Sequence, residues 1–127
     1  MTSSQIFFYG FLLLIIVLYV RRMLIQRSVT NYDASTVAEK LKAKENILLL
    51  DVRTSGERSR NHIPGSTHIP LHELRRRMNE LERYKEKEII CYCQSGSRSV
   101  SAAGTLNKNG FRAANLSGGI SMWNLRA

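Results

Sequence analysis

The chain has 127 residues, a net charge of +9 and only two cysteines. Because about twenty N-terminal residues are largely apolar, roughly one hundred remain for folding, which is close to the commonest domain size and leaves no room for a second domain. The positive charge favours anionic partners. No basic stretch is interleaved with aromatic residues, so we expect no nucleic-acid partner.

The N-terminal stretch predicts a membrane anchor. Residues 1–20 carry no charged side chain, and as a helix they would span ~30 Å, about one hydrocarbon core. Arg21, Arg22 and Arg27 follow at once. By the positive-inside rule, this basic cluster places the rest of the chain in the cytoplasm.

The alternative for this stretch is a cleaved signal peptide with an exported domain. Such a peptide needs basic residues before its apolar part and a small-residue cleavage site after it, and the sequence shows neither. We therefore predict a single-pass anchor in the inner or plasma membrane over residues 1–22, a tether over residues 23–32 and a cytoplasmic domain over residues 33–127.

Helix and strand signals alternate in the first half of the predicted domain. Asp33 or Thr36 would cap a helix that runs to about residue 43. The apolar run over residues 47–52 is typical of a strand buried on both faces of a parallel sheet. Further on we expect a short helix after Thr54, a short strand over residues 66–69 and an amphipathic helix over residues 71–83.

The second half continues the alternation. We expect a strand over residues 89–92, a helix over residues 98–108 that ends at Asn109-Gly110, a strand over residues 113–116 and a terminal helix after Gly118-Gly119. Strands that alternate with helices indicate an α/β domain with a mostly parallel sheet.

Cys93 lies at the end of a predicted strand, and a Gly/Ser loop joins it to the helix that begins at Arg98. Backbone N–H groups in such a loop can converge on an anion at a helix N-terminus. A thiolate held there is stabilised, so its pKa falls below the free value of about 8.5. We therefore predict that Cys93 is a nucleophile.

Cys91 lies two positions before Cys93, so along a strand the two Cα atoms would be ~6.6 Å apart. This is poor geometry for a disulfide, and two thiols are too few for a structural zinc site. We expect free thiols in a reducing compartment, Cys91 in the core, no metal and no organic cofactor.

Five motifs are spread over residues 33–124. They are Leu50-Asp51-Val52-Arg53 with Glu57; His62-Ile63-Pro64-Gly65-Ser66 leading to Ile69-Pro70; Cys93-Gln94-Ser95-Gly96-Ser97-Arg98-Ser99; Gly110-Phe111; and Leu116-Ser117-Gly118-Gly119 with Trp123. In this order they resemble a single-domain rhodanese, more narrowly one with an N-terminal membrane helix. The resemblance implies the rhodanese fold, a central parallel sheet flanked by helices, and sulfurtransferase chemistry through a cysteine persulfide.

The resemblance also assigns expected roles in the loop. Cys93 would take a sulfane sulfur from thiosulfate or a persulfide donor and pass it to a thiol or to cyanide. The residues expected to bind this sulfur through backbone N–H groups are Gln94, Ser95, Gly96, Ser97, Arg98 and Ser99, with the hydroxyls of Ser95 and Ser97 as further donors.

Charged residues outside the loop are expected to support it. Arg98 would either stabilise the negative charge directly or pin the loop by pairing with Asp51 or Glu57, and the rigid bidentate geometry of such a pair favours pinning. We expect Asp51, Arg53 and Glu57 to be polar anchors of the fold rather than catalysts.

Two other functions stay open at this point. One is a non-catalytic rhodanese-like module that binds a partner protein at the membrane. The other is phosphatase or arsenate-reductase chemistry, but phosphatase relatives have a loop one residue longer than the six residues from Cys93 to Arg98. They also commonly have a histidine where Tyr92 stands, so we rank this chemistry below sulfur transfer.

Overall fold

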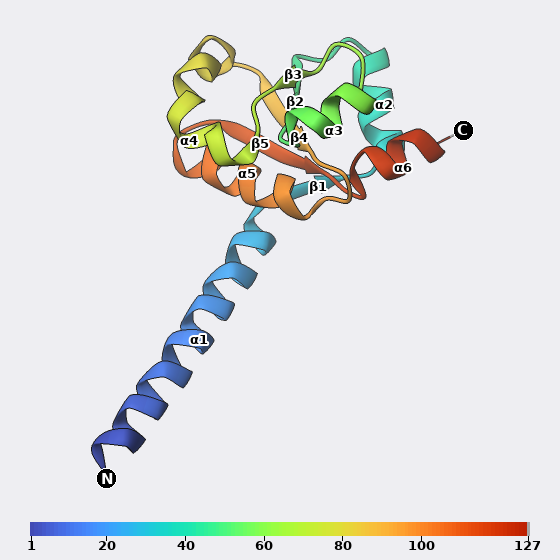
Figure 1. Ribbon diagram of the computed structural model, residues 1–127. Coiled ribbons are helices and arrows are strands. Elements are labelled where there is room, and N and C mark those ends of the chain that lie inside the picture. The colour runs from blue at the N-terminus through green and yellow to red at the C-terminus, as the bar shows by residue number, and fades with distance from the viewer. Residues whose placement is uncertain (127) are drawn as a thin grey trace.

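A parallel sheet forms the centre of the domain (Figure 1). The structure, a computed structural model, describes residues 1–126 apart from the side chains of residues 25–28. Within these residues five strands pair in parallel in the order β1-β5-β4-β2-β3, which confirms the predicted α/β architecture. The strands are β1 (Thr30–Tyr32), β2 (Ile47–Asp51), β3 (Thr67–His68), β4 (Glu88–Tyr92) and β5 (Arg112–Leu116).

Helices cover both faces of this sheet. On one face α5 packs against β4 and β5 and also contacts η1, whereas α2 contacts α6 on the other face. The helical elements of the domain are α2 (Ala34–Lys42), α3 (Ser55–Arg60), η1 (Leu71–Glu73), α4 (Leu74–Arg77), η2 (Met78–Tyr84), α5 (Ser97–Lys108) and α6 (Gly119–Leu125).

Side-chain alternation along β4 decides which face receives the cysteines. Successive residues of a strand point to opposite faces of the sheet. Cys91 and Cys93 therefore join the buried cluster that contains Ala102 of α5, whereas Ile90 and Tyr92 join the cluster on the opposite face. Cys93 thus lies on the same face of the sheet as the helix that begins just after its loop.

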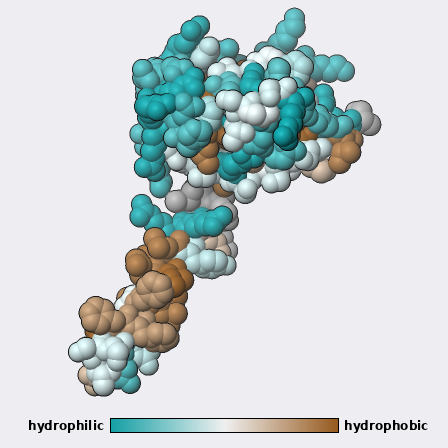
Figure 2. Space-filling view, viewed as in Figure 1, coloured by the Kyte–Doolittle hydropathy of each residue, from teal (hydrophilic) through white to brown (hydrophobic). Residues whose placement is uncertain are grey.

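The N-terminal helix α1 (Ser3–Ser28) extends away from the domain (Figure 1). Its stretch Ser3–Leu24 is long and apolar enough to cross a membrane, by length and composition alone, and none of it is buried against the domain. The apolar part is brown in Figure 2, below the largely hydrophilic domain. The structure thus provides a helix of suitable length, and the membrane assignment stays a prediction.

The tether expected over residues 23–32 is replaced by regular structure. α1 continues to Ser28, and only the buried Val29 separates it from β1. β1 pairs with β5, with Thr30 opposite Ala114. The strand escaped sequence analysis because Thr-Asn-Tyr carries no alternating apolar pattern. The long helix therefore joins the sheet almost directly.

Two predicted helices differ in detail. The segment expected as one amphipathic helix over residues 71–83 consists of η1, α4 and η2, a short α-helix between two 3₁₀ helices. In α2 the cap is Asp33, whose carboxylate accepts the N–H of Thr36 at 2.7 Å.

Gly119 allows α6 to lie against the cysteine loop. The N–H of Ile120 donates to the Cys93 carbonyl at 2.9 Å, and the N–H of Ser121 donates to the Gln94 carbonyl at 3.3 Å. A Cβ atom at Gly119 would lie 2.4 Å from the Cys93 carbonyl oxygen, and the backbone has φ +61°, a region that favours glycine. Only a glycine at this position permits the contact.

Replacing this glycine tests the close approach. Gly119→Ala should lower the free energy of unfolding by about 3 kcal/mol, since overpacking and left-handed strain act together. Gly65→Ala is the matched control: φ is +81° but nothing lies within 4 Å, so only the strain of about 1 kcal/mol applies. Chemical denaturation of the full chain in detergent, followed by Trp123 fluorescence, measures both, and equal losses would contradict the close approach.

Candidate active site

The sulfur of Cys93 lies inside the turn between β4 and α5. Cys93 directly follows the carboxyl end of the strand and is only 1% exposed. Gly96, with φ 114°, turns the chain into α5, and its N–H donates to Cys93 Sγ at 3.0 Å. The loop and the start of α5 thus place hydrogen-bond donors around the sulfur.

A buried polar pair extends this arrangement to the neighbouring strand. The Ser99 hydroxyl lies 3.3 Å from Cys93 Sγ and 2.5 Å from Asn115 Oδ1. The Asn115 amide is held in turn, because its Nδ2 donates to Asn31 Oδ1 of β1 at 2.9 Å. A hydroxyl has one hydrogen, so Ser99 can donate to the sulfur when the sulfur is ionised and to Asn115 when it is not.

These surroundings lower the pKa of the Cys93 thiol. Burial is the largest single influence on this pKa and raises it, but hydrogen bonds from the Ser99 hydroxyl and from the backbone N–H groups of Ser99, Gly96 and Ser95 together outweigh it. Burial raises the pKa of Cys91, and the nearby Cys93 raises it further. Of the two thiols, Cys93 is the one prepared to ionise.

Arg98 holds the start of α5 against α3. Its Nη1 and Nη2 donate to the two carboxylate oxygens of Glu57 at 2.7 and 2.8 Å. Glu57 also accepts the N–H of Thr54 in the capping box that opens α3. The hydrogen bond from Arg98 is the main reason that the pKa of Glu57 falls to about 2. This bidentate pair is the pinning arrangement expected for Arg98.

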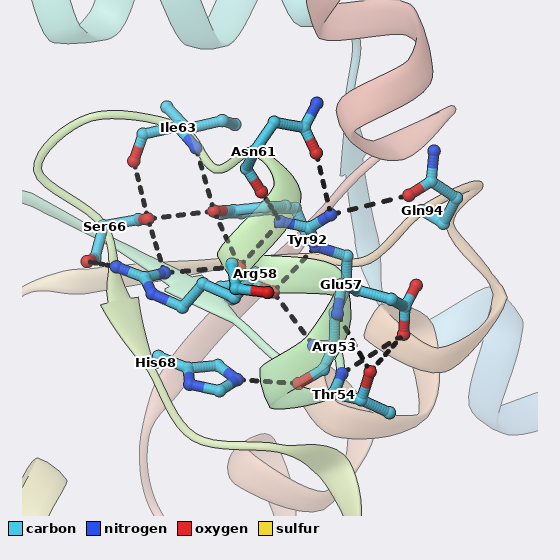
Figure 3. A network of polar contacts seen from close by, with 12 residues as sticks. Arg53, Thr54, Glu57, Arg58, Asn61, Ile63, Ser66, His68, Tyr92 and Gln94 are labelled. Carbon is cyan, nitrogen blue, oxygen red and sulfur yellow. Dashed lines mark hydrogen bonds and ion pairs between the residues drawn. The ribbon is translucent and has the colours of Figure 1, made fainter.

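Behind the loop lies a buried ionic network (Figure 3). Asp51, fully buried at the end of β2, accepts bonds from Arg53 Nε and Nη2 at 3.1 and 3.0 Å and from Arg58 Nη1 at 3.2 Å. Tyr92 donates its hydroxyl to Asp51 at 3.1 Å. Burial raises the pKa of Asp51, but the bonds from Arg53 and Tyr92 lower it overall. Asp51 is therefore a charged anchor.

Arg53 carries this network to the cysteine loop. Its Nη2 donates to the Asn61 carbonyl at 2.6 Å, and its Nη1 lies 3.5 Å from Gln94 Oε1. Figure 3 shows the Arg53 side chain between Asn61 and Gln94. The amide nitrogen of Gln94 donates to Ser121 Oγ of α6 at 3.0 Å. Gln94 thus joins the ionic network to α6.

The structure brings together only part of the predicted set around the sulfur. The N–H groups of Ser95, Gly96 and Ser99 and the Ser99 hydroxyl lie around the sulfur. The hydroxyls of Ser95 and Ser97 belong to exposed residues. Within residues 1–126 neither of these two hydroxyls forms a hydrogen bond to Cys93 Sγ. The Ser99 hydroxyl takes the role that we expected of them.

Sequence reasoning missed several supporting residues. Asn115 is the one polar residue among the four buried positions of β5, next to Ala113, Ala114 and Leu116, and this amide was the available signal. Nothing in the sequence around Arg58 or Tyr92 indicated a role at the site. Both residues meet Asp51 of β2 only in the folded domain, Arg58 from α3 and Tyr92 from β4. In the part of the chain that the structure describes, no three His, Cys, Asp or Glu side chains gather as a metal site would require.

Two relatives match most of the chain. A sulfurtransferase of Allochromatium vinosum is 35% identical over 96 residues, which cover 75% of this chain and 88% of the relative. The uncharacterized Bacillus subtilis protein YqhL is 35% identical over 119 residues, 93% of this chain and 88% of its own length. A match of that extent includes most of α1.

Solved structures share the fold. A rhodanese-related protein from Thermoplasma volcanium has a TM-score of 0.69 at 30% identity, covering 76% of this chain and 91% of that one. The thiosulfate sulfurtransferase of Pseudomonas aeruginosa has a TM-score of 0.70 at 29% identity, covering 78% of this chain but 19% of that enzyme.

These relatives support sulfur transfer as the general activity. The sequence profile of the rhodanese-like domain matches residues 33–126, which include the sheet from β2 onward and the whole cysteine loop. The family that the motifs indicated is therefore confirmed, and this chain belongs to the rhodanese-like domain family.

Proposed function

We propose that the protein is a membrane-anchored sulfurtransferase in which Cys93 carries the sulfur as a persulfide. The donor is thiosulfate or a persulfide, and the acceptor is a thiol, or cyanide in an assay. One observation carries the proposal: the Cys93 sulfur accepts bonds from the Gly96 N–H and the Ser99 hydroxyl and has a lowered pKa. A thiolate is the nucleophilic form of cysteine.

In the first step the Cys93 thiolate attacks the outer, sulfane sulfur of the donor. A new S–S bond forms to Cys93 while the donor's own bond to that sulfur breaks. The bonding pair leaves with the remainder of the donor, as sulfite from thiosulfate or as a thiolate from a persulfide. Cys93 is only 1% exposed. This favours a donor whose sulfane sulfur is at the end of the molecule, because a terminal atom can reach a buried thiolate.

In the second step the acceptor thiolate attacks the outer sulfur of the persulfide, and Cys93 leaves as a thiolate. The donors that stabilise the resting thiolate also stabilise this leaving group. Splitting the transfer in two replaces one difficult step by two easier ones. Gly96 and Ser99 serve both steps, and Arg98 keeps the turn in shape through Glu57.

The same geometry weighs against the other candidates. A module that only binds a partner does not need an ionised cysteine, so the lowered pKa of Cys93 favours chemistry. Phosphatase or arsenate-reductase chemistry needs a turn wide enough to enclose a tetrahedral anion with several oxygens. The six-residue turn from Cys93 to Arg98 is one residue shorter than that of the phosphatase relatives.

The proposed place of action is the cytoplasmic side of the inner or plasma membrane, with residues 1–22 as the anchor. The length and composition of Ser3–Leu24 support the anchor. Arg21 and Arg22 at its domain end support the orientation. Small sulfur donors and thiol acceptors on that side are the proposed partners.

Removing the nucleophile tests the function. Cys93→Ala should reduce thiosulfate:cyanide turnover to background and abolish the added sulfur mass after exposure to a persulfide donor. Cys91→Ala is the control, because Cys91 is a buried core residue and should keep both. Turnover by Cys93→Ala, or no sulfur adduct on the wild-type protein with either donor, would refute the proposal.

Removing the pinning charge tests the support of the loop. Glu57→Gln keeps the capping box but loses the ion pair, so we expect turnover to fall roughly tenfold or more through misplacement of the loop. The pKa of Glu57 is lowered to about 2 from 4.5, so its stabilising effect is present above pH 4.5 and is lost as the pH falls through 2.

Denaturation of both proteins across this pH range checks the second expectation. The wild-type chain should be the more stable one at pH 7, and the difference should shrink as the pH falls from 4.5 toward 2. A difference that stays constant to pH 2 would contradict the role of the ion pair.

A further inference from the structure

A cleft opens between the domain end of α1 and the outer side of α5. Its volume is about 430 Å³, and its lining includes Leu18 of α1 and Val100 of α5. Four cationic residues line it: Arg21 and Arg22 from α1, Arg75 from α4 and Lys108 from the end of α5. Among the residues whose side chains the structure describes, no carboxylate belongs to its lining.

The acidic residues of the chain are also absent from the two helices, α1 and α5, that form most of the cleft. All ten acidic residues lie within residues 33–88, where twelve Lys and Arg residues leave a net charge of only +2. The rest of the chain, which includes α1 and α5, has no acidic residue and carries +7 of the net +9. The cleft therefore lies between two elements that offer an anion no repulsion.

The cations of the cleft are free to bind a ligand. Within residues 1–126, none of the four forms an ion pair, whereas the neighbouring Arg76 and Arg77 are both paired with glutamates. Because only Val29 separates α1 from β1, the sheet holds the two sides of the cleft near one another. The site is thus assembled from α1 and the domain together.

The cleft also lies at a definite depth. Leu18 belongs to the last turns of the apolar stretch Ser3–Leu24, and Arg21 and Arg22 come one turn later. Figure 2 shows the hydrophilic band where the brown part of α1 ends, just below the domain. In a membrane-spanning helix this is the level of the phospholipid headgroups.

We propose that this cleft binds the phosphate of an anionic phospholipid and so seats α5 on the bilayer surface. The inference rests on the proposed membrane anchor and adds a lipid site that involves the domain itself. Ser97 lines the cleft and is also part of the Cys93 loop. The bound headgroup therefore places Ser97, at the start of α5, beside the membrane surface.

Native mass spectrometry of the full chain in a neutral detergent tests this site. Titration with phosphatidylglycerol should show one tightly retained lipid, and phosphatidylcholine should show none. The double variant Arg75→Glu, Lys108→Glu should weaken phosphatidylglycerol binding at least about tenfold, since each basic residue near a headgroup contributes about 1 kcal/mol. The control Lys42→Glu, Arg83→Glu makes the same charge change at exposed positions outside the cleft and should bind as the wild type does.

Two results would overturn the proposal. One is equal affinity for phosphatidylglycerol in the wild-type protein and the cleft variant. The other is displacement of the lipid by inorganic phosphate at comparable concentration, which would identify a site for soluble anions. No sulfur donor is present, so a failure of sulfur transfer leaves the result unaffected. Flotation of the protein with neutral phosphatidylcholine vesicles tests the anchor separately.

Discussion

The structure depends on one set of hydrogen bonds, those that the turn after β4 directs at the sulfur of Cys93. Burial alone would keep this thiol protonated, as it does for Cys91. The N–H groups of the loop and the Ser99 hydroxyl reverse that preference. Every other feature near the site keeps the turn in the shape that brings these donors together. Arg98 and Glu57 hold it on one side, and α6, through Gly119, holds its carbonyl groups on another.

Contacts continue from this turn toward the N-terminal helix. Ser99 touches Asn115 of β5, Asn115 touches Asn31 of β1, and β1 follows α1 after a single residue. The helix that we propose to lie in the membrane is therefore joined to β1, whose Asn31 holds Asn115, the hydrogen-bond partner of Ser99. A long flexible tether would have separated the two. The basic cleft lies between α1 and α5, the helix that begins just after the cysteine loop.

The sequence predicted the parts whose cause is local. The apolar runs of β2 and β4, the Thr54–Glu57 capping box and the glycines around α6 each carry their signal within a few residues. The pairing within the ionic network could not be predicted from neighbouring residues in the sequence, because Asp51 meets Arg58 and Tyr92 only after the sheet forms. β1 was missed for the same reason: three residues without an apolar pattern become a strand only because β5 offers a free edge. Among the loop hydroxyls, the curvature at Gly96 turned Ser99 inward and left Ser95 and Ser97 outside, which composition cannot show.

The most direct test is a titration of the Cys93 thiol in the intact protein, followed by the ultraviolet absorbance of the thiolate. The pKa of Cys91 is raised by burial, so the thiol transition at the lower pH belongs to Cys93 alone. We expect its midpoint below the free value of about 8.5, and we expect Ser99→Ala to raise it by roughly one unit, the equivalent of one lost charged hydrogen bond. A wild-type midpoint at or above the free value, unchanged in Ser99→Ala, would contradict the account.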